Sequence, residues 1–249
     1  MDQYKKAIPK TLNLKPSSIK FYKGDKLKCV VTTWEYMESL CRKVAEQIIE
    51  DGFKADVIVA LAKGGWFAGR VLCDLLNVRD LISLNVEHYT GVDEKSIEIK
   101  YSIPKEAVDS KNVLIVDDLV NTGLSLNTAK EYVKEFNPKT IKTATLQLLS
   151  TSQFIPDYFG EYMEEFAWVI FPWNFIEEMV DITSKVMKAN ELWSEWDIKW
   201  EIYKQFEINP IYLEISQPRR FEEVLEIMHR RGIFEKVVKN GKTFWRLRV

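Results

Sequence analysis

The chain has 249 residues, of which 46% are hydrophobic and 29% are charged, and its formal net charge is −2. This length is sufficient for one full α/β domain with a smaller appendage, and the composition is typical of a soluble globular protein. The net charge gives no electrostatic reason to expect nucleic acid as a partner, because proteins that bind it usually carry a basic excess. No signal peptide or membrane-spanning stretch is evident, so we expect a cytoplasmic protein without membrane contact.

Cysteine and histidine are too sparse to suggest a zinc site. The three cysteines form no CxxC pair, and the chain has only two histidines. Cys41 and Cys73 lie in apolar helical patterns, so we interpret them as buried, reduced thiols.

The first two thirds of the chain alternate between helical patterns and short apolar runs. Thr33 is placed to cap a helix that ends near Asp51 and Gly52, and further helical patterns cover residues 67–76 and 125–136. The apolar runs are rich in β-branched residues, which is typical of strands buried on both faces of a parallel sheet. These runs are residues 57–61, 81–86, 113–116, 141–149 and 168–171. The alternation predicts an α/β fold with a doubly wound, mostly parallel sheet.

Three segments interrupt or follow this pattern. Residues 88–110 are polar and contain a short alternating piece, which predicts a long loop or flap with a ribbon in it. Residues 174–206 are helical in pattern, and Trp193, Trp196 and Trp200 recur at helical spacing, which we interpret as a packing face. Residues 218–249 predict a helix and then a hairpin with a type I′ turn at Asn240-Gly241.

We therefore divide the chain into a domain of residues 1–175 and a helical and β-hairpin extension of residues 176–249. The extension has two interpretations. It is either a small cap that packs on the first domain, which we prefer, or the end of a winged-helix module.

The strongest chemical signal is the stretch from Val113 to Ser125, where an apolar strand leads into two carboxylates and a Thr-Gly turn. Backbone N–H groups at the start of the following helix would form a cradle for a phosphate. Gly123 allows the backbone to approach an anion closely. Asp117 and Asp118 are placed to hold the two hydroxyls of a sugar and the waters of a Mg²⁺ ion.

This stretch resembles the motif with which type I phosphoribosyltransferases bind 5-phosphoribosyl-1-pyrophosphate (PRPP). The resemblance extends over roughly residues 20–175 and implies that Asp117 and Asp118 hold the ribose hydroxyls and act with Lys63 in catalysis. It also implies that one loop wraps the 5′-phosphate, namely Asn121, Thr122, Gly123, Leu124 and Ser125. Mg²⁺ would be held mainly by substrate and water, and a homodimer is the assembly that the family implies.

Two further segments are similar to loops of the same family. Lys63-Gly64-Gly65 resembles the pyrophosphate loop, in which the Lys63–Gly64 peptide bond is expected to be cis. The flap resembles the mobile hood that closes over PRPP, and Tyr89 stands where related enzymes carry an aromatic residue. Closure of a hood would exclude water from the transition state.

The segment 168–173 resembles the base pocket of bacterial xanthine–guanine phosphoribosyltransferases. This resemblance implies that Trp168 stacks on the purine and that the backbone of Val169 reads its edge. Two positions depart from the pattern of 6-oxopurine enzymes. Leu149 replaces a lysine that donates to O6, and Asn121 replaces an aspartate near N7. An asparagine can donate or accept a hydrogen bond, but it cannot act as a general base.

These resemblances predict a salvage enzyme that converts PRPP and a purine, with a 6-oxopurine favoured, into a nucleoside 5′-monophosphate and pyrophosphate. Adenine or another base is the enzymatic alternative. A different class is a regulator on the same fold that senses PRPP or a nucleotide, with the C-terminal extension as its effector or DNA-binding part. The presence of Lys63 and both aspartates favours the enzyme, because non-catalytic relatives often lose one or more of them.

Overall fold

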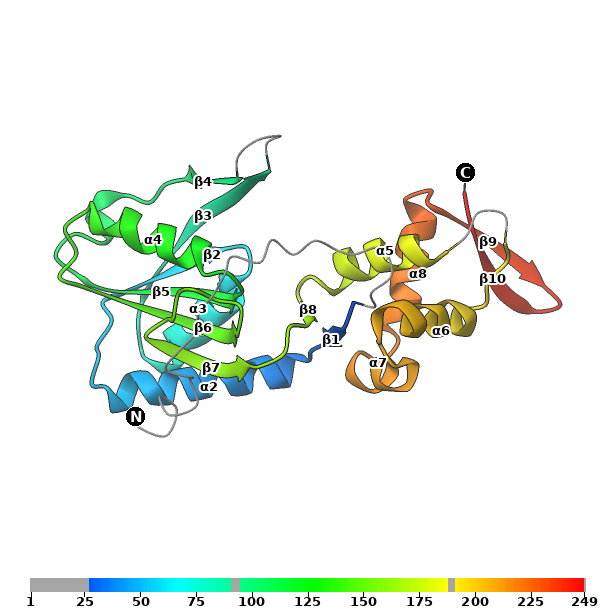
Figure 1. The fold of residues 1–249 in the computed structure, drawn as a ribbon, viewed down its shortest axis with the longest axis horizontal. Coiled ribbons are helices and arrows are strands. Elements are labelled where there is room, and N and C mark those ends of the chain that lie inside the picture. The colour runs from blue at the N-terminus through cyan, green and yellow to red at the C-terminus, as the bar shows by residue number, and fades with distance from the viewer. Residues whose placement is uncertain (1–26, 91–94, 188–190, 249) are drawn as a thin grey trace.

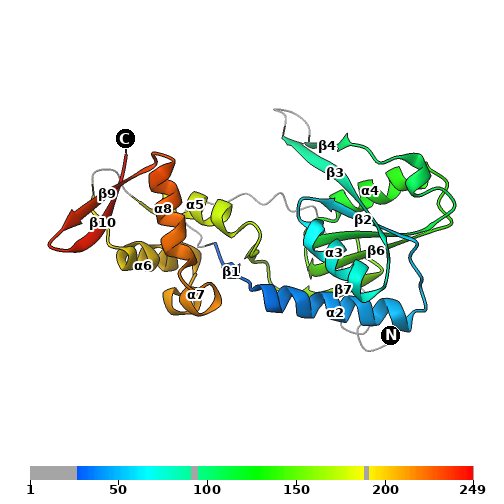
Figure 2. The ribbon, with the colours of Figure 1, turned by 180° about the vertical axis from the view of Figure 1, so that it is seen from behind.

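The computed structural model describes residues 27–90, 95–187 and 191–248, without the side chains of residues 88–90 and 95–97. It consists of two lobes, one built around a central sheet and the other around helices and a hairpin (Figure 1). Figure 2 shows the same separation from behind. Among the described residues, no helix is long and apolar enough to cross a bilayer.

A six-stranded sheet forms the centre of the first lobe, as the alternating pattern predicts. Its spatial order is β4-β3-β2-β5-β6-β7, and every neighbouring pair is parallel except β3 and β4. The strands are β2 (Val57–Ala62), β3 (Asp80–Thr90), β4 (Lys95–Tyr101), β5 (Asn112–Val120), β6 (Thr140–Leu149) and β7 (Tyr158–Met163). The antiparallel pair of β3 and β4 is the ribbon expected in the flap.

Helices cover both faces of this sheet, and each face has its own core. Helices α2 (Trp34–Glu50) and α3 (Gly65–Leu75) pack on one face, and α4 (Leu124–Lys134) packs on the other. The short 3₁₀ helix η1 (Lys105–Ala107) lies between β4 and β5. Thr33 caps α2 as predicted, because its hydroxyl accepts a hydrogen bond from the amide of Tyr36. The doubly wound α/β architecture is therefore confirmed.

The structure corrects two strand assignments. Residues 168–171 do not join the central sheet, because β8 (Trp168–Ile170) pairs with β1 (Cys29–Val31) in a separate parallel pair. The edge of the central sheet is instead β7, which the sequence analysis missed. Its mixed composition lacks a continuous apolar run, because an edge strand has only one neighbour and is less buried than central strands.

The second lobe contains α5 (Phe175–Val186), α6 (Glu195–Phe206), α7 (Pro210–Ser216), α8 (Arg220–Arg230), β9 (Phe234–Lys239) and β10 (Lys242–Leu247). Asn240 and Gly241 both have positive φ, 51° and 73°, as a type I′ turn requires. The apolar side chains of this lobe bury one another, together with Cys29, Val31 and Ile170 from β1 and β8. The second lobe therefore has a hydrophobic core of its own, to which β1 and β8 contribute.

The tryptophan stripe is a packing face only in part. Trp193 precedes α6 and exchanges two backbone hydrogen bonds with Trp245, whereas Trp196 and Trp200 are 51% and 46% exposed. The buried face of α6 consists of Ile198, Lys199, Ile202 and Phe206. The large aromatic residues made the opposite face look like the buried one.

Candidate active site

The two loops expected to bind PRPP lie at the same edge of the sheet. Strands β2 and β5 are parallel neighbours in register, with Ala60 opposite Val116, so their carboxyl ends meet. A Cβ atom added to Gly64 would overlap the Asp118 carboxylate, and one added to Gly65 would overlap the carbonyl oxygen of Val116. The glycines after β2 therefore allow this loop to contact the acidic end of β5.

Lys63 is exposed at this edge, two residues before α3. Its carbonyl oxygen accepts a hydrogen bond of 3.3 Å from the amide of Trp66. The cis peptide bond in this loop joins Ala62 to Lys63, one bond earlier than the resemblance implied.

Asp117 and Asp118 lie within β5, which continues to Val120 and does not end before the carboxylates as expected. Both side chains are half-buried, and the amide of Asp118 donates a 3.0 Å hydrogen bond to Asp117 Oδ1. Burial and, next, the Asp118 charge raise the pKa of Asp117 well above its ordinary value. Burial raises the pKa of Asp118 to about 6, although the hydrogen bond from Trp173 acts in the opposite direction. A cation beside this pair would therefore be favourable.

The predicted phosphate loop bends at Gly123, which has a φ of +84° and precedes the first turn of α4. Gly123 has no side chain with which to cap the helix, and the amide of Leu124 donates a 3.4 Å hydrogen bond to the hydroxyl of Thr122. A Cβ on Gly123 would also overlap the Cβ of Phe154. Ser125 is half-buried in the first turn of α4, whereas Thr122 and Leu124 are exposed.

The segment after β6 supports this loop, and the sequence analysis did not predict this. The amide of Gln153 donates to the carbonyl oxygen of Thr122 at 3.2 Å. The hydroxyl of Thr151 lies 2.8 Å from Asn121 Oδ1, so the Asn121 side chain is held at the base of the loop. No local sequence signal connects residues 151–154 with residues 121–123, because the contact depends on the packing of β5 beside β6.

The aromatic residue that contacts the acid pair is Trp173, which ends the segment 168–173 and for which the sequence predicted no role. Its indole Nε1 donates to Asp118 Oδ2 at 3.3 Å. Trp168 donates instead to Glu178 Oε2 at 2.8 Å and is 39% exposed, while the Val169 side chain is buried. Trp173, two residues before α5, and not Trp168 in β8, is therefore next to Asp118.

Two other predicted positions are Leu149 and Tyr89. Leu149 is 1% exposed at the end of β6, opposite Met163, so it belongs to the interior of the domain. The backbone of Tyr89 lies in β3 opposite Ser96, but its side chain is outside the described residues.

A metal site made only of protein side chains is not evident. Within the described ranges, no group of three or more His, Cys, Asp or Glu residues is arranged to hold a metal ion. Two adjacent carboxylates with raised pKa values would nevertheless favour a cation whose other ligands come from substrate and water. The acid pair thus fits Mg²⁺ as a metal shared with a phosphorylated substrate.

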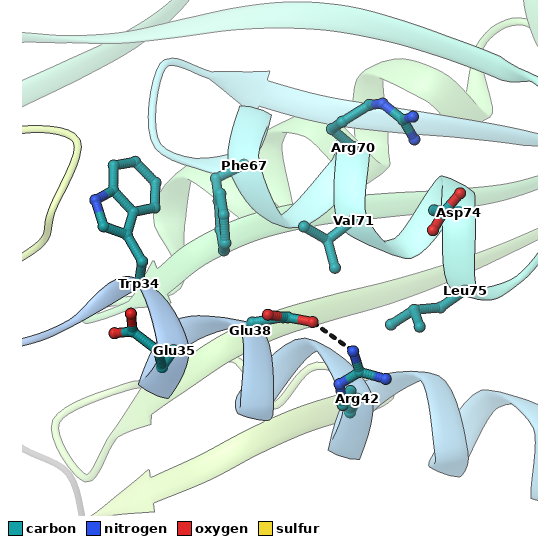
Figure 3. A pocket seen from close by; sticks show the side chains of 9 residues that line it. All are labelled: Trp34, Glu35, Glu38, Arg42, Phe67, Arg70, Val71, Asp74 and Leu75. Atoms are coloured by element: carbon teal, nitrogen blue, oxygen red, sulfur yellow. Dashed lines mark hydrogen bonds and ion pairs between the residues drawn. The ribbon is translucent and has the colours of Figure 1, made fainter.

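A cavity of about 440 Å³ lies between α2 and α3 (Figure 3). Its walls combine apolar and charged side chains of both signs, and Glu38 forms an ion pair with Arg42 across one turn of α2. The lining residues are Trp34, Glu35, Glu38, Arg42, Phe67, Arg70, Val71, Asp74 and Leu75. This mixture of charges does not define a ligand class. The cavity matters here because Trp34 and Phe67, at one end, also contact Trp173.

Comparison with known proteins identifies the family of the first lobe. Residues 31–175 match the family described as the phosphoribosyl transferase domain. This match covers more than half of the chain, which therefore belongs to the phosphoribosyltransferase family of enzymes.

The most informative relatives act on purines. The chain is 27% identical over 153 residues to the xanthine-guanine phosphoribosyltransferase of Chromohalobacter salexigens, covering 60% of this chain and 88% of that protein. It is 32% identical to the purine phosphoribosyltransferase of Pyrococcus horikoshii, with a TM-score of 0.52, covering 58% of this chain and 93% of that structure. A Helicobacter pylori xanthine-guanine-hypoxanthine phosphoribosyltransferase shares the fold at 17% identity and a TM-score of 0.54, covering 61% of this chain and 98% of that structure.

Proposed function

We propose that this protein transfers the 5-phosphoribosyl group of PRPP to a purine base and releases pyrophosphate. The observation that carries the proposal is the contact between Gly64 and the Asp118 carboxylate. This contact brings a loop suited to a diphosphate within reach of carboxylates suited to ribose hydroxyls. PRPP carries both groups on one sugar.

Each segment then takes one part of the substrate. Asp117 and Asp118 accept hydrogen bonds from the ribose hydroxyls and hold Mg²⁺ through its waters. Residues 121–125 bind the 5′-phosphate at the start of α4, where the helix dipole and the backbone N–H groups favour an anion. Lys63 and the amides of Gly64 and Gly65 bind pyrophosphate. Tyr89 belongs to the hood, and Trp168 and Val169 remain the predicted contacts to the base.

The chemistry requires positioning more than acid–base catalysis. The bond between C1′ and the pyrophosphate oxygen breaks as a bond between C1′ and a base nitrogen forms, and the proton on that nitrogen passes to water. The ribose is positively charged in the transition state, so nearby carboxylates stabilise it. A bound Mg²⁺ would neutralise charge on the departing pyrophosphate. Asn121 cannot accept the proton, but it can hydrogen-bond the base.

The 6-oxopurines are our preferred bases because the relatives at 27–32% identity include enzymes named for xanthine, guanine and purines. A buried leucine cannot donate a hydrogen bond, so Leu149 cannot replace the lysine that donates to the exocyclic oxygen in 6-oxopurine enzymes. A 6-oxopurine would need another donor at this oxygen. Adenine therefore remains the alternative substrate, to be compared with the 6-oxopurines.

The decisive experiment incubates the protein with PRPP, Mg²⁺ and hypoxanthine, guanine, xanthine or adenine separately and follows pyrophosphate release. We expect at least one 6-oxopurine to give the nucleoside 5′-monophosphate, with no release when Mg²⁺ is chelated. Release with adenine alone would transfer the assignment to that base. No release with any base would reject the function. Sedimentation of the same sample tests whether this protein is a homodimer, as we propose from the family.

The regulator alternative rests on the second lobe, in which a helix leads into a hairpin. Three basic residues around α8 are paired with acidic ones, which lowers the positive charge available to bind DNA. Glu222, Glu223 and Glu226 form ion pairs with Arg219, Arg220 and Lys236. We therefore favour the enzyme. Salt-sensitive retardation of DNA in a gel at low ionic strength would support the regulator, and its absence would discard it.

A further inference from the structure

We propose that Trp173 is a positioning residue that holds the Asp118 carboxylate in the orientation needed to bind the ribose of PRPP. This inference rests on the proposed function. Its physical basis is the contact between the Trp173 indole Nε1 and Asp118 Oδ2, which are 3.3 Å apart.

The orientation of the indole is set by a cluster of aromatic rings from three parts of the chain. Phe171 stacks on Trp173 with 4.8 Å between ring centroids and 7° between planes. Phe67 of α3 stacks on it at 5.0 Å, and Trp34 of α2 lies tilted at 5.8 Å. Figure 3 shows Trp34 and Phe67 facing each other across the end of the cavity. A ring packed by three others keeps its N–H group in one direction.

The backbone around Trp173 is fixed as well. The Phe171 amide donates to Asn174 Oδ1 at 2.9 Å, and the Asn174 amide donates back to the Phe171 carbonyl at 3.3 Å. These two bonds close a tight turn immediately before α5. The turn therefore determines where the indole N–H lies.

The carboxylate is thus confined by two neighbours. Gly64 leaves no space for a Cβ atom beside the Asp118 oxygens, and the indole donates to one of those oxygens. Such a contact orients the acceptor lone pairs of the carboxylate toward a substrate.

A purely structural role predicts a different behaviour. If Trp173 only fills space, Trp173→Phe should preserve function, because phenylalanine keeps most of the stacking and loses only the N–H group. If it positions Asp118, the same substitution should impair PRPP binding while the fold stays intact. Trp196→Phe is the matched control, since Trp196 is 51% exposed on α6 in the other lobe.

The test measures steady-state kinetics of Trp173→Phe, Asp118→Ala and the double variant, together with PRPP binding by calorimetry. We expect Trp173→Phe to raise KM for PRPP about tenfold, the effect of losing one hydrogen bond to a charged group. We expect KM for the base to change less than twofold. In the Asp118→Ala background, Trp173→Phe should have no further effect on PRPP binding, because the acceptor is already absent. Equal effects in the two backgrounds, or an unchanged KM for PRPP, would overturn the inference.

A spectroscopic measurement tests the contact without turnover. In ¹H–¹⁵N spectra of the whole protein, the indole signal that disappears in Trp173→Phe should shift in Asp118→Ala, and the Trp196 signal should not. An unshifted signal would show that the indole does not bond to Asp118. An active wild type with an unaffected Trp173→Phe variant rejects this inference alone. A wild type that neither turns over nor binds PRPP rejects the proposed function, and the inference with it.

Discussion

A methyl group on Gly64 would occupy the space that the Asp118 carboxylate fills, although the two residues are far apart in the sequence. We therefore expect Gly64→Ala to displace the carboxylate and to reduce pyrophosphate release by at least about 100-fold, as misplacement of a catalytic group commonly does. Gly52→Ala is the control. A Cβ atom at Gly52 would contact nothing, so the only cost of this substitution is the strain of a φ of +71°. That variant should lose about 1 kcal/mol of stability and keep its activity. Equal activity losses in the two variants would contradict the assignment.

The pKa of Asp118 predicts an opposition between stability and function. The folded protein raises this pKa from 3.8 to about 6, so the folded state binds the proton more tightly than the unfolded chain does. Stability is then greatest with the carboxyl protonated and falls as the pH rises through this window. Asp118→Asn should raise the free energy of unfolding by roughly 1–2 kcal/mol at pH 7 and by little at pH 4. Urea unfolding at both pH values measures this.

The same substitution should abolish most turnover at every pH, since a neutral amide no longer attracts Mg²⁺ or accepts from two hydroxyls as strongly. A variant that gains stability at pH 7 and loses turnover identifies Asp118 as a functional carboxylate and not a structural one. A variant that is less stable at pH 7 and fully active would show that Asp118 serves the fold.

Gly123 predicts a defect confined to phosphate binding. Its φ of +84° and its contact with Phe154 leave no room for a side chain. Gly123→Ala should therefore rearrange the start of α4 and weaken binding of ribose 5-phosphate about tenfold or more. Calorimetric titration with ribose 5-phosphate and with the free base separates the effects. Unchanged binding of the phosphate would exclude this loop as its site.

Introducing the family's lysine at Leu149 should not improve use of a 6-oxopurine, contrary to what the alignment alone suggests. Leu149 is 1% exposed, so Leu149→Lys would bury an ammonium group without a partner. We expect a loss of about 3–5 kcal/mol of stability or failure to fold. Leu149→Met, similar in volume, should cost less than about 1.5 kcal/mol. A stable, more active lysine variant would show that position 149 opens toward the base.

A buried lysine in the second lobe predicts a stability defect with no catalytic effect. Lys199 is 2% exposed and is paired with Glu195 and, at 2.5 Å, with Glu214. Lys199→Met should destabilise this lobe by about 3 kcal/mol, because two partly buried carboxylates lose their partner. Lys204→Met, which removes a lysine that is 68% exposed, should change stability by less than about 0.5 kcal/mol. Tryptophan fluorescence during unfolding and an activity assay would detect each effect.

The sequence by itself determined the local structure of this protein. The apolar run before Asp117, the glycine after Thr122 and the Asn240-Gly241 turn each specify a backbone path over a few residues. Short-range preferences decide such features: β-branched residues favour buried strands, and positive φ favours glycine and asparagine. The α/β class could be predicted for the same reason.

Only the tertiary structure decided which distant side chains meet. It brought Trp173, not Trp168, to Asp118, placed Phe154 against Gly123, and buried Leu149. It also gave the second lobe a core of its own and left Trp196 exposed on α6. Local preferences say which residue types favour a strand or a helix, but not which of two similar aromatic residues faces a given carboxylate. That choice depends on how strands and helices pack against one another over the whole chain.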